Sequence, residues 1–203
     1  MRPLLIAALV FGACAAQAGP LPPSGPVAKP APPSAHAAAK PKPAPKPLDE
    51  LFAALARAQS EEDAKPVEDA ILAQFQQSGS ATVDLLMARS AAALEAGDKK
   101  TARQIVDSIT DIAPDFAEAW HRRAVLQEDD GDDEGALISL QKTVSLNGRE
   151  FEAYAELGGM LEDYGDKKAA LAAWRRALAL DPQIDGAAKH VEALTREVEG
   201  EKI

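Results

Sequence analysis

The sequence predicts an all-α protein, a solenoid of antiparallel helix pairs that ends in a C-terminal capping helix. Two observations predict this fold. From residue 48 onward, apolar residues recur at three- and four-residue intervals, as amphipathic helices require. Several residue types also recur every 34 positions, which is the mark of a structural repeat. The first 48 residues differ in composition and predict an export signal followed by a linker.

Residues 1–18 have the pattern of a secretory signal peptide. Arg2 supplies a positive end, residues 4–13 are an apolar run, and Ala16-Gln17-Ala18 fits the small-x-small cleavage pattern before Gly19. The run is shorter than the roughly 20 residues that span a bilayer. We therefore expect an exported, periplasmic protein without a membrane span.

Cys14 is the only cysteine, so the chain can form no internal disulfide. Two interpretations of this residue remain open. In one, Cys14 belongs to a signal that is removed. In the other, Phe11-Gly12-Ala13-Cys14 acts as a lipobox, with Phe11 where leucine is usual, and Cys14 is lipidated. The second interpretation would anchor the protein in the cell envelope by a lipid.

Residues 19–48 contain 11 of the 15 prolines, with alanine, serine and lysine between them. Proline fixes φ and lacks a backbone donor, so this segment predicts a disordered Pro/Ala/Lys-rich linker. It is either a spacer or a tether that lies on a membrane or cell wall.

Residues 49–203 hold all 32 acidic residues but only 17 of the 22 Lys and Arg, because the other five lie in residues 1–48. The net charge of residues 49–203 is therefore −15. Such a domain repels phosphate backbones, which argues against a nucleic-acid partner.

Residues 49–82 predict a degenerate helix pair at the N-terminal end of the solenoid. Pro66 is placed near the start of the second helix, where proline is tolerated. The apolar residues that mark the two helices are Leu51, Phe52, Leu55, Ile71, Leu72 and Phe75.

Residues 83–116, 117–150 and 151–184 align without gaps as three repeats. Gly-Asp recurs at 97–98, 131–132 and 165–166, an alanine at 102, 136 and 170, and a proline or glycine at 114, 148 and 182. The glycine can end the first helix with a positive φ, and the aspartate can cap the second helix. The alanine permits a close helix crossing. Residues 185–203 then predict a capping helix and tail, whose apolar face is formed by Ala188, Val191, Leu194 and Val198.

This register resembles the tetratricopeptide repeat (TPR). The third repeat matches the family pattern nearly throughout, at Tyr154, Leu157-Gly158, Leu161, Ala170, Trp174, Ala177 and Asp181-Pro182. The second repeat departs from it at Arg123, Gln127 and Gly148, and the first has Arg89-Ser90 where Leu-Gly is usual. The resemblance implies a TPR-type α-α superhelix, similar to small exported bacterial TPR proteins, in which the first helix of each repeat lines a concave groove.

In that register, a set of polar and apolar residues is expected to face outward into the groove as a candidate partner-binding surface. These residues are Glu118, His121, Arg122, Val125, Glu128, Glu152, Glu156, Glu162, Lys189 and Arg196. Arg89 and Arg123 occupy equivalent positions on the packing stripes of their helices. Their guanidinium groups are expected either to pair with carboxylates of an adjoining helix or to form an anion site for a partner.

No constellation of residues in the sequence predicts catalysis, a cofactor or a metal. The acidic run at residues 128–134 imitates the start of a calcium loop, but Gln141 stands where that loop needs a bidentate carboxylate. It is interpreted as a solvated turn, with weak calcium binding as the alternative. His36, His121 and His190 have no metal-ligand spacing. We therefore expect a protein-binding scaffold that recognises a peptide or helix, with a tethered or self-associating assembly factor as the alternative and an enzyme disfavoured.

Overall fold

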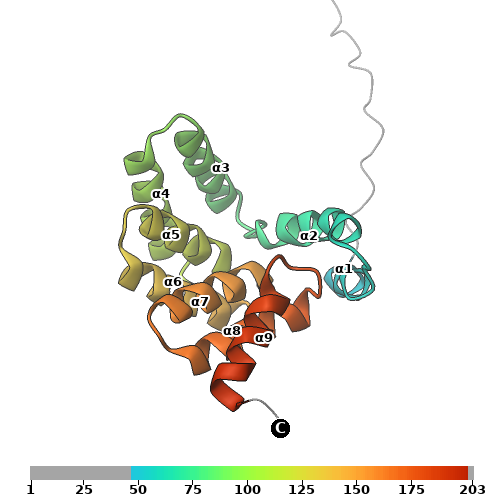
Figure 1. The fold of residues 1–203 in the computed structure, drawn as a ribbon. Coiled ribbons are helices and arrows are strands. Elements are labelled where there is room, and N and C mark those ends of the chain that lie inside the picture. The colour runs from blue at the N-terminus through green and yellow to red at the C-terminus, as the bar shows by residue number, and fades with distance from the viewer. Residues whose placement is uncertain (1–46, 201–203) are drawn as a thin grey trace, which may run out of the picture. The chain divides into compact units, whose positions relative to one another are not determined.

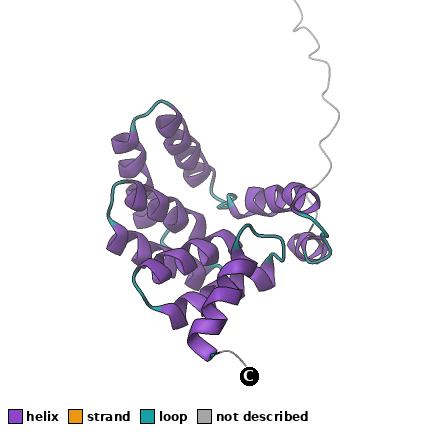
Figure 2. Ribbon diagram, in the orientation of Figure 1, coloured by secondary structure: helices purple, strands orange, loops and turns teal. Residues whose placement is uncertain are grey.

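The computed structural model describes residues 47–200, and this part of the chain consists of nine helices joined by turns, without strands (Figures 1 and 2). The signal peptide, Cys14 and nearly all of the linker lie outside the described residues. The helices are α1 (Leu48–Leu55), α2 (Glu61–Phe75), α3 (Ala81–Glu95), α4 (Lys99–Ile112), α5 (Ala117–Asp129), α6 (Asp133–Leu146), α7 (Phe151–Asp163), α8 (Lys167–Leu180) and α9 (Ala187–Glu199).

The three repeats form three antiparallel helix pairs, α3–α4, α5–α6 and α7–α8. The turn inside each pair is the same: Gly97, Gly131 and Gly165 have φ of +77°, +75° and +79°. The aspartate after each glycine accepts a hydrogen bond from the backbone N–H three residues later, at 3.0–3.1 Å. The glycine turn and the aspartate cap predicted from the 34-residue period are therefore confirmed.

Small residues let the two helices of each pair approach closely. The repeated alanines, Ala102, Ala136 and Ala170, are fully buried. Gly158 has the same role in the third pair, because a Cβ there would lie 2.8 Å from Nε1 of Trp174. One apolar cluster joins α5 and α6 to α7 and α8 around Leu140 and Leu157.

The capping helix α9 packs against α8, as predicted, after a left-handed Gly186 at φ +70°. Its buried residues are Ala187 and Leu194, which pack with Trp174 and Leu171. The expectation for Ala188 is wrong, because this residue is exposed and its neighbour Ala187 takes the inward position.

The N-terminal pair α1–α2 packs on the third repeat and not beside the first (Figure 1). Leu51, Phe52 and Leu55 share an apolar cluster with Phe151 of α7 and Leu180 of α8. Within residues 47–200, no apolar cluster joins α1 or α2 to α3 or α4. The sequence indicated the two helices, but it did not indicate that they pack against the third repeat.

Pro66 lies inside α2 and not at its start. The first turn of α2 begins at Glu61, capped by the hydroxyl of Ser60, so Pro66 stands in the second turn. The carbonyl of Glu62 therefore loses the hydrogen bond that an N–H at position 66 would donate. In the described part of the chain, every helix is too short or too polar to cross a membrane.

Candidate partner-binding groove

The first helices of the three pairs, α3, α5 and α7, form one face of the solenoid, and three hollows open on it. The hollow between α3 and α5 has a volume of about 380 Å³ and is lined by Leu94, Val125, Leu126, Glu128 and Asp129. The hollow between α5 and α7 has about 350 Å³ and is lined by Glu128, Ala155, Glu156, Gly159, Met160, Asp163 and Trp174. The third, of about 190 Å³, lies where α2 meets α5 and α7.

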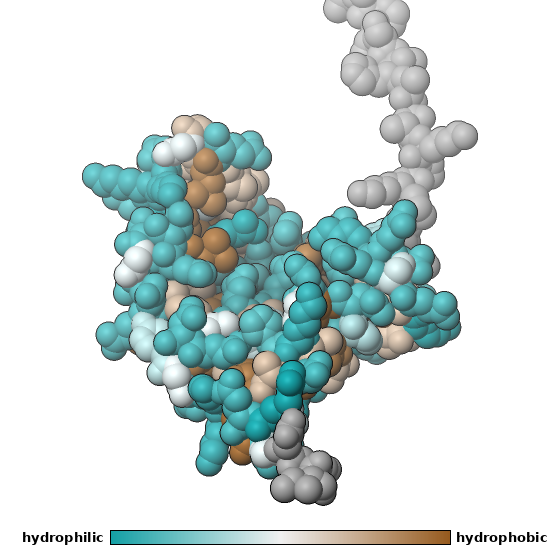
Figure 3. All heavy atoms as spheres, in the orientation of Figure 1, coloured by the Kyte–Doolittle hydropathy of each residue, from teal (hydrophilic) through white to brown (hydrophobic). Residues whose placement is uncertain are grey.

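Part of the surface predicted from the sequence is open. Val125 is 42% exposed, Glu128 is exposed, and Glu156 is partly exposed. The surface in Figure 3 is mostly hydrophilic, with an apolar strip beside α3. Leu85, 61% exposed, is the most exposed large apolar residue of residues 47–200. The hollows themselves combine apolar side chains, such as Val125 and Met160, with carboxylates.

The residues predicted from α9 and the end of α7 mostly pair with the protein itself. Glu162 accepts hydrogen bonds from Nε1 of Trp174 at 2.9 Å and lies 2.7 Å from Nδ1 of His190, whose ring stacks on Trp174. Arg196 pairs within α9 with Glu192, and Lys189 is exposed. Glu162 and Trp174, through their contacts with His190, hold α9 on the third repeat.

The expectation that Glu118 and His121 face solvent is wrong. They are only 5% and 7% exposed. Leu72 of α2 and Gln76, which follows that helix, line the same 190 Å³ hollow as Glu118 and His121, so the returning N-terminal pair covers this end of the groove. The repeat register placed both residues on the inner face correctly, but it carried no information about α2.

The imidazole of His121 lies among glutamates. Its Nε2 is 3.0 Å from Oε2 of Glu156, and its Nδ1 is 3.8 Å from Oε2 of Glu118. Burial alone would lower the pKa of His121, but the carboxylates of Glu118 and Glu156 outweigh burial and raise it to about 10. Burial likewise acts to raise the pKa of Glu118, yet His121 and Arg122 lower it overall.

Glu150 belongs to the same cluster, although no sequence argument singled it out. It precedes α7 and is fully buried, and its Oε2 accepts a hydrogen bond from Asn147 at 2.8 Å. Its Oε1 has no hydrogen-bond partner within residues 47–200. Burial raises the pKa of Glu150 to about 7, against the opposing effect of His121. Burial also raises the pKa of the neighbouring Glu152.

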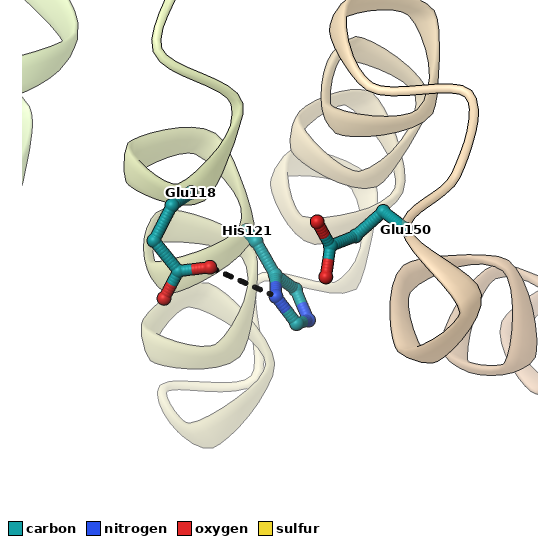
Figure 4. Close-up of side chains that lie close together, drawn as sticks. All are labelled: Glu118, His121 and Glu150. Carbon is teal, nitrogen blue, oxygen red and sulfur yellow. Dashed lines mark ion pairs between the residues drawn. The ribbon is translucent and has the colours of Figure 1, made fainter. Parts of the chain in front are cut away.

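Glu118, His121 and Glu150 point toward one another from α5 and from the residue before α7 (Figure 4). One donor atom of each lies within 4.8 Å of the other two, and all three residues are buried. These three are the residues of the described chain that could hold a metal. The sequence signal that could have found two of them is Glu-x-x-His, which places residues 118 and 121 on one helix face.

The two arginines at equivalent positions behave differently. Arg123 is one-third exposed, and its Nε lies 3.1 Å from Oδ1 of Asp107 on α4, with the guanidinium 5.4 Å from the centre of the Trp120 ring. Of the two arrangements expected for Arg123, an ion pair with an adjoining helix or an anion site for a partner, the structure shows the ion pair. Arg89 is exposed and does not lie on the packing stripe, because Ser90 takes the buried position.

The acidic run is tied to neighbouring basic residues. Asp129 pairs with Lys99, Asp130 pairs with Arg103 at 2.8 Å, and Asp132 caps α6. Since residues 133–146 are helical, the carboxylates do not wrap around a common centre. The acidic run therefore surrounds the turn between α5 and α6, and its Asp129, Asp130 and Asp132 pair with neighbouring basic residues or cap a helix.

Comparisons with known proteins point to one kind of repeat. No protein-family model matches the chain. A TPR repeat-containing protein of Rhizobium etli is 29% identical over 155 residues, which is 76% of each chain. Among solved structures, the TPR domain of Sgt2 from Aspergillus fumigatus has a TM-score of 0.51 at 20% identity, over 59% of this chain and 81% of that domain.

Two further solved structures share the fold over a similar stretch. An O-GlcNAc transferase of Thermobaculum terrenum matches with a TM-score of 0.50 and 25% identity over 57% of this chain, which spans only 22% of the transferase. The type III secretion chaperone SycD of Yersinia enterocolitica, solved in complex with a peptide of the translocator YopD, matches with a TM-score of 0.51 and 13% identity, over 58% of this chain and 95% of the chaperone.

Proposed function

Because this chain is a tetratricopeptide-repeat protein, we propose that it is a non-enzymatic scaffold that binds a helical segment of another protein in its groove. The observation that carries the proposal is the pair of open hollows on the α3–α5–α7 face, with Val125 exposed in the hollow between α3 and α5. The peptide complex of the chaperone SycD is in keeping with such a role. A helix is the expected ligand, because the chain's own α2 already lies against α5 and α7 at one end of the same face.

The lining of the hollows suggests the chemistry of the partner segment. The hollow between α5 and α7 presents the carboxylates of Glu128, Glu156 and Asp163 around the apolar Met160 and Trp174. Among the residues that the structure describes, no basic side chain lines this hollow. A partner helix with small apolar residues on one side and Lys or Arg at the flanks complements this surface in shape and charge.

A role without catalysis is supported by the pairing of the histidines. Among the residues that the structure describes, His121 and His190 hydrogen-bond to glutamates and not to a hydroxyl nucleophile. The location we propose is the bacterial cell envelope, on the basis of the signal-like residues 1–18 and the proline-rich linker. The alternative is an envelope-tethered, self-associating assembly factor anchored through Cys14.

Site-specific photocrosslinking tests the groove. A photoreactive amino acid placed at Val125, in the groove, is compared with one at Ile138 on α6, which is 58% exposed. We expect a defined partner to be captured only from position 125, and Val125→Asp to abolish binding of that partner's segment while Ile138→Asp leaves it intact. Equal capture from both positions, or full binding by Val125→Asp, would contradict the groove proposal.

Two measurements distinguish the assembly factor from the partner-binding scaffold. The intact mass of the protein recovered from its native host distinguishes a chain that begins at Gly19 from one that begins at an acylated Cys14. Sedimentation over a range of concentrations shows whether the protein self-associates. A lipidated chain whose mass rises with concentration would favour the assembly factor.

A further inference from the structure

Two side chains on α5 each have one polar atom that a hydrogen bond holds and one that, among the described residues, makes only a longer contact. Nε2 of His121 is bonded to Glu156, while its Nδ1 is 3.8 Å from Glu118, beyond hydrogen-bond distance. Oε1 of Glu118 is bonded to Nη2 of Arg122 at 2.9 Å, so Oε2 is the oxygen that faces the imidazole. The hydrogen-bonded atoms fix the orientation of both groups, and the other two atoms, Nδ1 and Oε2, face each other at 3.8 Å.

Glu150 repeats this arrangement from the other side. Asn147 holds its Oε2, whereas its Oε1 has no partner although the residue is fully buried. A buried carboxylate oxygen without a donor is unfavourable, because it has lost its hydration without gaining a hydrogen bond. Because native proteins leave few such atoms, this oxygen points to a ligand in the space between the three side chains.

We propose that Glu118, His121 and Glu150 form a binding site for one divalent transition-metal cation of the Zn²⁺ type. Imidazole nitrogen together with carboxylate oxygen suits zinc and its neighbours, whereas calcium and magnesium prefer sites made of oxygen alone. The hydrogen bond from Nε2 to Glu156 is the contact that orients a metal-ligating histidine, so Glu156 acts as a positioning residue.

The surrounding charge favours a cation. Glu118, Glu150, Glu152 and Glu156 gather around one imidazole, and Arg122 is bonded to one of these carboxylates. A bound cation neutralises carboxylates that are otherwise buried in excess.

The site is accessible and needs a modest contraction. Glu118 and His121 line the 190 Å³ hollow beneath α2, which gives an ion a route and leaves room for a water as the fourth ligand. Donor atoms of a tetrahedral zinc site lie about 3.4 Å apart, as metal–ligand bonds of about 2.0–2.1 Å require. The three donor atoms here lie within 4.8 Å of one another, so small rotations of the long glutamate side chains bring them to that distance.

The test uses the full chain with Cys14→Ser, His36→Ala and His190→Ala, which removes every cysteine and histidine except His121. Zn²⁺ is titrated by calorimetry, and Co²⁺ replaces it for visible absorption spectroscopy. We expect one equivalent of Zn²⁺ to bind and to raise the melting temperature, and Co²⁺ to give the absorption of a low-coordinate site. Mg²⁺ and Ca²⁺ are expected to bind at least tenfold more weakly.

Glu150→Gln in the same background is the decisive variant. It keeps the shape of the side chain and removes a charge whose burial is unfavourable, so the variant is expected to fold with unchanged circular dichroism and still lose Zn²⁺ affinity by about tenfold or more. His121→Ala is expected to lose the site altogether. Absence of Zn²⁺ binding to the parent chain, or equal affinity in folded Glu150→Gln, overturns the proposal. Either result is independent of whether the groove binds a partner.

Discussion

Arg149 lies over the ring of Phe52, with its guanidinium carbon 3.9 Å from the ring centre, and its Nη1 is 2.6 Å from Oδ1 of Asp49. The two contacts join the loop before α7 to α1. Phe52 also meets Phe151 edge to face, with ring centres 6.5 Å apart, and the side-chain amide of Gln183 donates to the carbonyl of Ala58. The N-terminal pair is therefore held on the third repeat by stacking, charge and apolar packing together.

Phe52→Ala is expected to detach α1 and α2 from the third repeat. Phe52 is 8% exposed, and removing a buried phenylalanine side chain typically costs about 3–5 kcal/mol. We expect amide hydrogen exchange in α2 to accelerate strongly, while α5 to α8 keep their protection. Leu85→Ala is the matched control, because this leucine is 61% exposed and its loss should change stability by about 0.5 kcal/mol or less. Unchanged exchange in α2 would argue against this docking.

The sequence predicted the helix pairs well because the features that make them are local. Three features act within one repeat: the glycine with positive φ, the aspartate that caps the N–H three residues later, and the alanine at the close helix crossing. Their recurrence every 34 residues therefore located three turns at once.

The docking of α1–α2 could not be predicted in the same way. Phe52 and Phe151 are apolar residues that any packed core would accept, and nothing in the spacing says which repeat buries them. The burial of Glu118 and His121 follows from that docking, so it was missed for the same reason. Gln127 was recognised as a departure from the family pattern, but its bonds to Asp132 and Ser139 depend on how α5 meets α6.

Arg123→Met is expected to change stability little. The pair with Asp107 is 33% and 45% exposed, and exposed ion pairs contribute about 0–1 kcal/mol. The methionine keeps apolar contact with Trp120, so the free energy of unfolding should fall by about 1 kcal/mol or less. Arg89→Met, at the exposed equivalent position, is the control and should change nothing measurable. A loss of several kcal/mol in urea unfolding for Arg123→Met would show that the pair is better shielded than its exposure indicates.

Glu68 of α2 and Asp181 after α8 bring two acidic groups together where the N-terminal pair meets the third repeat. Asp181 is fully buried, and one of its carboxylate oxygens lacks a hydrogen-bond partner. Burial, followed by the proximity of Asp181, raises the pKa of Glu68, and burial raises the pKa of Asp181. Two carboxyl groups in this position share a proton more readily than they both ionise.

The sign of the pH dependence follows from these raised values. The folded state holds more protons on the two groups than the unfolded state does, so their contribution to stability is complete below the ordinary carboxyl pKa values. It is lost as the pH rises through the raised pKa of each group in the folded state. At pH 7 the pair therefore destabilises the docking of α2.

Glu68→Gln is expected to raise the melting temperature at pH 7 by about 2–4 °C, the shift that about 1 kcal/mol produces in a protein of this size. The amide keeps the shape of the side chain and can donate to Asp181. The gain should shrink as the pH falls toward 4, because the raised pKa values of both groups let the wild-type pair take up protons as the pH is lowered. Asp69→Asn is the matched control. Nζ of Lys65 lies 3.5 Å from Oδ1 of Asp69 and 3.6 Å from Oε2 of Glu68, so both variants lose an ion pair with the same lysine. The side chain of Asp69, however, is 64% exposed. Thermal melts of the three proteins at both pH values make the comparison. A gain in Glu68→Gln that persists at pH 4, or an equal gain in Asp69→Asn, would show that repulsion from Asp181 is not the cause.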